Sequence, residues 1–375
     1  MLAEPLVAIW LTGALVGVAA APLGLFLVLR GTAMLTDAVA HSIVLGIVLV
    51  WMLTGATAGP VQLLGAALAG VATVSLTGML QRSRLVASDA AIGLVFPALF
   101  AAGVLLINLH ARDVHVDVDT VLLGEIGFVW LETQHVAGVE VPVAVLTLAL
   151  VALVNAAFVA AFWKELKLGS FDPALAAALG LAPGALHQAL LVLTSVTAVA
   201  SFDAVGAILF IAFAIVPSAT ALFLTDRPAR ALGLAMGVAL LAAAAGQTLA
   251  FALDVSIGGM MAVCAGAMFA LALLAAPQRG VLARWRRRQS EAADRAARTM
   301  VAHLHTHEDG PEARIECTGA ALSAHLHWTP KQAASVILHG LDRGLIQRQG
   351  DALILTAKGR AEAQAIFDPA GRERR

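Results

Sequence analysis

The chain has 375 residues, of which 60% are hydrophobic and only 13% are charged. Soluble proteins carry about 25% charged residues, so this composition indicates a membrane protein. The net charge of −1 provides no overall basic field that would attract nucleic acid. The two cysteines, Cys264 and Cys317, imply no disulfide framework.

Nine apolar segments follow one another, and most approach the roughly 20 residues that a membrane-spanning helix needs. The sixth is short, and only Asp203 and Ala204 separate it from the seventh, so eight spans are the alternative. The segments are Leu6–Leu29, Ala33–Thr54, Val61–Leu80, Ala90–Leu109, Val141–Phe162, Leu190–Phe202, Val205–Leu224, Ala231–Leu253 and Ile257–Ala276. The sequence therefore predicts an all-α polytopic membrane domain with eight or nine transmembrane helices.

Asp37 and His41 form an ionisable pair within the second apolar segment. Residues four apart share one helical face, so the carboxylate and the imidazole would project together. Ionisable groups are costly inside a membrane and usually mark an ion or substrate path. Oxygen and nitrogen ligands also suit Mn(II), Fe(II) or Zn(II). A hydrogen-bonded pair that fixes helix packing is the alternative interpretation.

Charged residues divide the chain into two parts. The first 289 residues contain 13 Lys and Arg and 14 Asp and Glu, whereas the last 86 residues contain 11 of each. We therefore expect a membrane domain over residues 1–280, a basic linker over 281–290 and a small soluble domain over 291–368. Lys and Arg also lie in alternate connections between the apolar segments, with Arg112 as the only exception. The positive-inside rule then predicts an N-terminus outside the cell and a C-terminus in the cytoplasm.

One basic connection, residues 164–187, is too polar to span a membrane. Asp172 as N-cap and Pro173 at the first helical position predict a short helix over Ala174–Leu179, which Gly180 would end. A short cytoplasmic helix suits docking to a soluble partner. A connector that lies on the membrane surface is the alternative.

Five stretches in the first 280 residues carry a combined pattern. They are MLTDAVAHSIVLGIVL at 34–49, SDAAIGLVFPALFAAGVLLIN at 88–108, VDVDTVLLGEI at 116–126, KELKLGSFDPALAAALGL at 164–181 and AVGAILFIAFAIVPSATALFL at 204–224. In this order and spacing they resemble the permease subunits of bacterial ABC importers for zinc, manganese and iron, the ABC-3 family. The chain departs from that family at Thr36, at Val39 and Ala40, and at 43–45, which concerns the local bend of the helix rather than the ionisable pair.

The resemblance implies a type II ABC importer-like permease in a bacterial cytoplasmic (inner) membrane. Such a permease is not an enzyme and holds no covalent cofactor; it works as a homo- or heterodimer with a cytoplasmic ABC ATPase subunit and an extracytoplasmic metal-binding protein. Asp37 and His41 would line the path of a transported divalent metal ion. The ATPase coupling helix would comprise Phe171, Asp172, Pro173, Ala174, Leu175, Ala178, Leu179 and Gly180.

Energy for transport would have to come from outside the chain. No G-x-x-x-x-G-K-[ST] motif occurs, so a partner or an ion gradient must supply it. An outer surface that attracts the metal would comprise Asp113, His115, Asp117, Asp119 and Glu125. Solvated loop charge is the alternative for each of these residues.

The polar end of the chain has a helical pattern with one hairpin. The expected elements are a periodic stretch at Arg295–His305, helices at Ala320–Leu326 and Thr329–Arg343, strands at Leu345–Arg348 and Ala352–Thr356, and a helix at Lys358–Ile366. This order resembles a winged helix of the α+β class, similar to the N-terminal domain of iron- or manganese-dependent repressors. Because its charges balance, we expect a cytoplasmic regulatory or interaction module and no nucleic-acid partner.

Histidines alternate at 303, 305 and 307 and again at 325 and 327. A regulatory metal site could draw on His303, His305, His307 and Cys317 at an irregular helix end, with Glu308 or Asp309 completing it. Residues two apart do not share a helix face, so polar surface histidines are the alternative.

Two other functions compete with an importer permease. A self-sufficient secondary metal transporter needs ionisable residues on several membrane helices, and a membrane-anchored transcription factor needs a basic recognition surface. The apolar segments carry little charge beyond Asp37 and His41, and the soluble part is balanced. The sequence therefore favours the permease.

Overall fold

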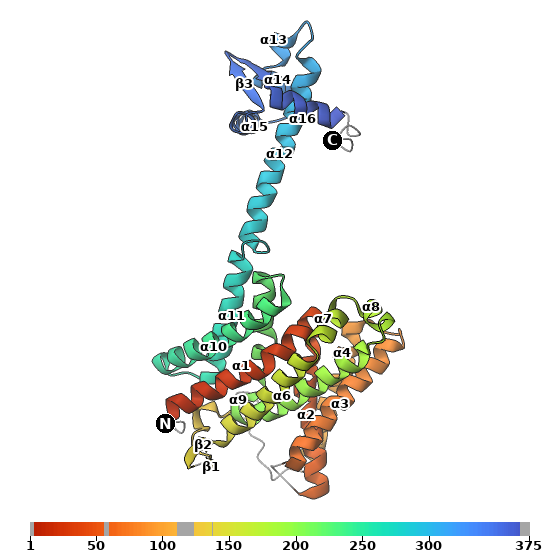
Figure 1. The fold of residues 1–375 in the computed structure, drawn as a ribbon, viewed down its shortest axis with the longest axis vertical. Helices are drawn as coiled ribbons and strands as arrows, with labels where there is room; N and C mark the ends of the chain where they lie inside the picture. The colour runs from red at the N-terminus through yellow and green to blue at the C-terminus, as the bar shows by residue number, and fades with distance from the viewer. Residues whose placement is uncertain (1–3, 56–59, 111–123, 137, 368–375) are drawn as a thin grey trace. The chain divides into compact units, whose positions relative to one another are not determined.

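The computed structural model describes residues 4–55, 60–110, 124–136 and 138–367. The chain divides into two compact units, Met1–Gly280 and Val281–Arg375, both seen in Figure 1. The N-terminal unit contains α1 (Pro5–Leu29), α2 (Met34–Thr54), α3 (Pro60–Arg82), α4 (Ser88–His110), η1 (Ile126–Phe128), β1 (Thr133–Val136), β2 (Val139–Pro142), α6 (Val143–Ala161), α7 (Trp163–Phe171), α8 (Pro173–Ala178), α9 (Pro183–Leu224), α10 (Pro228–Leu253) and α11 (Ile257–Ala275).

Nine helical stretches within the described residues are long and apolar enough to cross a membrane. Two of them belong to α9, which is interrupted at Gly206 (φ 70°, ψ 174°). The predicted polytopic helical fold is confirmed, and the short sixth segment is a full-length candidate. It begins at Pro183 rather than at Leu190, because its first turns contain polar residues and the apolar pattern therefore starts later than the helix.

The interruption in α9 lies against the chain at Gly124. A Cβ at position 124 would be 2.2 Å from the backbone nitrogen of Gly206, and both residues have positive φ. Only glycine takes such a conformation readily and permits so close an approach of two backbones. The connection before α6 is therefore fixed to the break between two candidate spans.

Helix α1 is the most deeply packed candidate span and contacts α6, α9 and α10. Three buried side chains from these neighbours bond to its backbone. Asn155 Nδ2 donates to Ala19 O at 3.0 Å, Ser218 Oγ to Ala21 O at 2.9 Å and Gln247 Nε2 to Leu6 O at 2.9 Å. Interhelical hydrogen bonds in membranes contribute about 0.6 kcal/mol each, so together they favour one arrangement of these helices.

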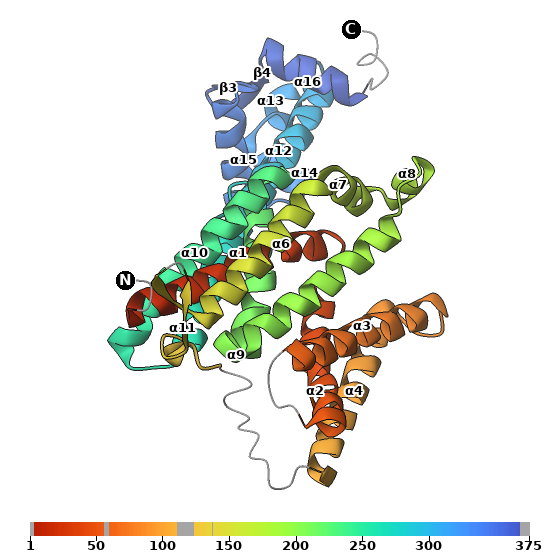
Figure 2. The same cartoon turned by 60° about the horizontal axis from the view of Figure 1, so that its bottom comes forward.

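Helices α2, α3 and α4 form a group that joins the rest of the unit through α9 (Figure 2). Helices α2 and α3 approach closely, since a Cβ at Gly46 would lie 2.2 Å from the carbonyl oxygen of Gly65. Small residues permit this kind of contact between helices in lipid. The same group carries the Asp37–His41 pair on α2.

The C-terminal unit has its own hydrophobic core. Its elements are α12 (Val281–His307), α13 (Ala313–Glu316), α14 (Gly319–His325), α15 (Pro330–Asp342), β3 (Ile346–Gln349), β4 (Ala352–Leu355) and α16 (Ala357–Phe367). Met300, Val301 and Leu304 of α12 pack with Leu322 of α14 and Leu353 of β4. Strands β3 and β4 pair antiparallel, with Ile346 opposite Leu355.

Most expected elements of this unit are present within one or two residues of their predicted bounds. Thr329 accepts a hydrogen bond from the Gln332 backbone in a capping box that starts α15. The basic segment 281–290 is the first part of α12 rather than a separate linker. Further along α12, Asp294 pairs with His339 and Arg343 of the α15 region at 2.8 and 2.7 Å. The hydrogen bond with His339 is the main cause that lowers the pKa of Asp294.

Candidate functional site

The pair on α2 has the geometry that its spacing predicts. His41 Nε2 lies 3.3 Å from Asp37 Oδ1, and the two side chains are 33% and 32% exposed, respectively. Both belong to a regular helix from Met34 to Thr54, in which residues four apart lie one above the other. The pair is thus neither buried in the core of the unit nor fully open.

Two aromatic rings of α4 flank the imidazole of His41. The ring of Phe96 stacks on it, with centroids 5.9 Å apart and planes 28° from parallel. The ring of Phe100 meets it edge to face, at 5.9 Å and 72°. Contact with these two rings limits the space in which the imidazole can rotate. No sequence pattern identified these two phenylalanines as partners of His41, because the contact depends on how α4 packs on α2.

Of the residues predicted to attract metal on the outer side, only one can be placed. Asp113, His115, Asp117 and Asp119 lie outside the described residues. Glu125 is exposed and directly precedes η1. It lies next to Gly124, which contacts the break in α9.

The predicted coupling segment is a separate short helix, α8, directly after α7. The Asp172 carboxylate accepts a hydrogen bond from the Leu175 backbone N–H at 2.9 Å, so the expected N-cap is confirmed. Gly180 follows the helix with φ 81°. Phe171, Leu175 and Leu179 are 61%, 46% and 65% exposed. The remaining predicted residues, Pro173, Ala174 and Ala178, are also exposed.

Arg30 ties this segment to two other parts of the unit. Its Nε donates to Ser170 Oγ on α7 at 3.2 Å, and its Nη1 donates to the carbonyl of Pro183 on α9 at 3.4 Å. Arg30 directly follows α1. A displacement of α7 and α8 would therefore be transmitted to the ends of α1 and α9.

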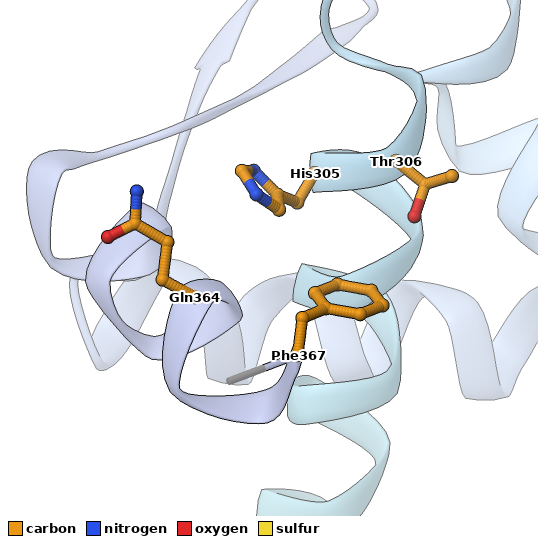
Figure 3. Close-up of a pocket in the computed structure, with 4 residues that line it drawn as sticks. All are labelled: His305, Thr306, Gln364 and Phe367. Atoms are coloured by element: carbon orange, nitrogen blue, oxygen red, sulfur yellow. The ribbon is translucent and has the colours of Figure 1, made fainter. Parts of the chain in front are cut away.

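The tail histidines are arranged differently from the predicted set. His303 and His307 lie together with Glu316 and His325. His305 instead pairs with Glu308 at 3.0 Å and lines a hollow with Thr306, Gln364 and Phe367 (Figure 3). Cys317 is buried in the hydrophobic core. Positions two apart are about 200° apart around a helix, which explains why His305 faces α16 while its neighbours do not.

Comparison with known families identifies the N-terminal unit. The model of the "ABC 3 transport family" matches residues 3–276. The chain belongs to the ABC 3 transport family. The resemblance inferred from the five sequence stretches is therefore confirmed for this part of the chain.

Several family members are similar to the chain over most of their length. The "Zinc transport system membrane protein TroD" of Treponema pallidum (strain Nichols) is 41% identical over 358 residues, 96% of this chain and 98% of that protein. The "Manganese transport system membrane protein MntD" of Bacillus subtilis (strain 168) is 44% identical over 272 residues, 72% of this chain and 92% of that protein. Similarity to TroD therefore extends into the C-terminal unit.

A solved structure supports the fold of the ABC 3 unit. The chain is similar to one in "PsaBC from Streptococcus pneumoniae in complex with Fab", with a TM-score of 0.61 and 25% identity. The match covers 72% of this chain and 91% of that chain.

Proposed function

We propose that the chain is the membrane permease subunit of an ATP-binding cassette importer that moves divalent transition-metal ions, Mn, Zn or Fe, into the cytoplasm. The observation that carries this proposal is the Asp37–His41 pair on a candidate membrane-spanning helix of an ABC 3 family chain. Ionisable groups at such positions mark ion paths. The names of TroD and MntD, which refer to zinc and manganese, agree with the chemistry of the pair.

The two side chains have complementary roles toward a metal ion. The Asp37 carboxylate offsets the positive charge, and neutral His41 provides a nitrogen ligand of intermediate softness. Both side chains are about one third exposed in a single chain. A second permease subunit, identical or homologous, would bring a second pair and give four protein ligands. Such a site would hold an ion until a rearrangement separates the two subunits and, with them, the two Asp–His pairs.

Energy for that rearrangement comes from a separate ATPase. The chain has no G-x-x-x-x-G-K-[ST] motif. The exposed apolar side chains of Phe171, Leu175 and Leu179 suit insertion into a groove on a soluble partner. Through Arg30, movement of α7 and α8 would reach α1 and α9. These observations support α8 as the ATPase coupling helix.

Charge supports one orientation of the chain in the membrane. Basic residues in the α7–α8 connection and in every second connection along the chain favour the cytoplasmic side of a bacterial inner membrane for these connections, with the N-terminus outside. The opposite side would receive the metal from an extracytoplasmic binding protein. Glu125 and the acidic residues at 113–119 would attract the cation there.

We further propose that the C-terminal unit is a winged-helix-like regulatory module rather than a DNA-binding one. The order of four helices (α12 to α15, of which α13 is a single short turn), a β3–β4 hairpin and a final helix supports the first part. The whole unit carries 15 basic and 11 acidic residues, but four of the basic ones lie at 284–288, and the part after Gln289 is balanced at 11 of each. This balance after Gln289 supports the second part of the proposal. Helix α15, which would be the recognition helix, carries only Lys331 and Asp342 as charged residues.

Metal uptake tests the proposed function. The permease is reconstituted in vesicles with its ATPase and binding protein, and uptake of Mn, Zn and Fe is compared between wild type, Asp37→Ala and His41→Ala. Loss of ATP-dependent uptake in assembled mutants would support the metal path and identify the metal. Unchanged uptake would reduce the pair to a packing feature, and uptake without ATP would indicate a secondary transporter.

A further inference from the structure

A second group of metal-ligand side chains lies in the C-terminal unit. His303 and His307 are four residues apart on α12, Glu316 ends α13, and His325 ends α14. One ligand atom from each residue lies within 4.8 Å of the ligand atoms of the other three. The group therefore joins three consecutive helices, α12, α13 and α14.

The Glu316 carboxylate is the centre of this group. Its Oε2 atom lies 2.7 Å from His307 Nδ1 and 3.7 Å from His325 Nδ1. The backbone oxygen of Glu316 forms a hydrogen bond with His303 Nε2 at 3.3 Å. The imidazole of His303 has its centroid 4.6 Å from that of His307 and 5.4 Å from that of His325. Three imidazoles thus lie around Glu316, two at its carboxylate and one at its backbone oxygen.

Hydrogen bonding accounts for only one of these contacts, that of His303 Nε2 with the Glu316 backbone oxygen. Among the described residues, Glu316 Oε2 is buried yet has no partner with hydrogen-bond geometry, although His307 Nδ1 is only 2.7 Å away. The nitrogen and the oxygen approach each other off the line of an N–H bond. A metal site requires nitrogen and oxygen ligand atoms that are close together and free to bind an ion, and Glu316 Oε2 with the three imidazoles meets this requirement within 4.8 Å.

We propose that His303, His307, Glu316 and His325 bind a divalent transition-metal ion, with Zn²⁺ as the preferred ion. Zinc takes four ligands in a tetrahedron at about 2.0–2.2 Å, which places ligand atoms about 3.4 Å apart. The observed limit of 4.8 Å is close enough for side-chain rotation to complete the site. Three nitrogen ligands and one oxygen favour Zn²⁺ over Mn²⁺, which prefers more oxygen ligands.

Access and neighbouring groups are consistent with an ion that exchanges with solvent. His303, His307 and Glu316 are half-buried, and His325 is exposed. A bound ion would fasten α13 and α14 to α12. Cys317 follows Glu316 but faces the core, where burial is the main cause that raises the pKa of its thiol. It is not a member of the site.

His305 provides a matched control on the same helix. It is partly exposed, like His303 and His307, but its Nδ1 contacts Glu308 and its ring faces α16 in the hollow of Figure 3. Removing His305 takes away an imidazole of the same kind from α12 without touching the group. His327, whose Nδ1 lies near the Ala324 carbonyl, is a second control.

The test is metal binding to the full-length chain, purified in detergent with an affinity tag that contains no histidine. All variants carry Asp37→Ala and His41→Ala, so that ions held by the transmembrane pair do not contribute. The chain is stripped with a chelator and titrated with Zn²⁺, and Co²⁺ is added separately as a spectroscopic probe. Hydrogen exchange of α13 and α14 is followed with and without Zn²⁺.

We expect one Zn²⁺ per chain, a four-coordinate Co²⁺ spectrum and increased protection of α13 and α14. His307→Ala and Glu316→Gln should each lower the affinity about tenfold or more, whereas His305→Ala and His327→Ala should not. Metal-free hydrogen exchange checks that the variants fold as the parent chain does. Absence of binding in the parent, or equal loss in the His305→Ala control, would overturn the site. Since the transport pair is absent throughout, the result does not depend on whether the proposed transport function holds.

Discussion

His41 lies between two phenyl rings of α4, and this placement determines how its imidazole can meet an ion. Phe96 and Phe100 are both 5.9 Å from it, centroid to centroid. A ligand whose rotation is restricted loses little conformational freedom when a metal binds. Residues that orient a metal ligand in this way usually matter for affinity without touching the ion.

Replacing Phe100 by Leu tests this role. The change keeps an apolar side chain but removes the ring edge that holds the imidazole of His41. We expect metal uptake to fall about tenfold while Asp37 and His41 remain in place. The measurement is the concentration dependence of uptake in reconstituted vesicles, where the loss should appear mainly at low metal concentration.

Phe251→Leu on α10 is the control, since Phe251 is 52% exposed and belongs to another part of the unit. An equal loss in both variants would mean that the effect comes from general destabilisation. An unchanged Phe100→Leu protein would show that the ring is only packing.

Contacts within one helix could be predicted from the sequence, whereas contacts between helices could not. The spacing of Asp37 and His41 was sufficient to place both on one face, because residues four apart in a helix always meet. Phe96 and Phe100 belong to a different helix, and only the packing of α4 on α2 brings them to His41. In the tail, the packing of three helices likewise brings Glu316 and His325 to His303 and His307. The sequence had instead suggested His305 and Cys317 as partners of these two histidines.

At the scale of single elements, the local signals around α8 were strong. A cap, a proline and a glycine lie within nine residues, and each acts on its own backbone neighbours. The start of α9 was not predicted correctly, because hydrophobic periodicity does not mark a helix whose first turns are polar. The structure adds that Phe171, Leu175 and Leu179, in and beside α8, are exposed, whereas Ala176 is buried.

Leu175→Glu tests α8 as the coupling helix. Leu175 is 46% exposed, so a charge there should leave the fold intact but prevent its insertion into an apolar groove. Loss of a central apolar anchor costs about 2 kcal/mol or more, roughly 30-fold in affinity for the ATPase. Co-purification with the ATPase and metal-stimulated ATP hydrolysis should both decrease strongly.

The control is Gln188→Glu, which adds the same charge at an exposed position of α9 outside α8. It should retain ATPase binding. If Leu175→Glu bound the ATPase normally, α8 would have to be a connector on the membrane surface, as the alternative interpretation of its sequence holds.

At the scale of the whole chain, the helices of the N-terminal unit could be predicted from composition, whereas the metal-ligand group of the C-terminal unit could not. Composition and the alternation of basic connections describe a polytopic membrane unit, since long apolar helices are a property of local sequence. The C-terminal elements could be listed, but their metal-ligand group could not, because it depends on three elements packed around one core. The similarity to MntD covers only 72% of this chain, which is about the share of the N-terminal unit. The match covers 92% of MntD, so this relative contains no counterpart of the whole C-terminal unit, and we expect the tail to modulate transport rather than perform it.

The last prediction concerns that modulation and follows from the proposed metal group. Vesicles with the complete transporter are loaded with increasing Zn²⁺ on the side that carries the C-terminal unit, and the initial rate of uptake is measured. In the wild type we expect the rate to fall about fivefold or more, the usual size of coupling between two sites. His307→Ala and Glu316→Gln should match the wild type at low internal metal and lose the decrease at high internal metal, while His305→Ala should keep it. A decrease that persists unchanged in both cluster variants would place the inhibition at the transmembrane pair, because an ion on the cytoplasmic side can also reach Asp37 and His41 and slow their release of metal.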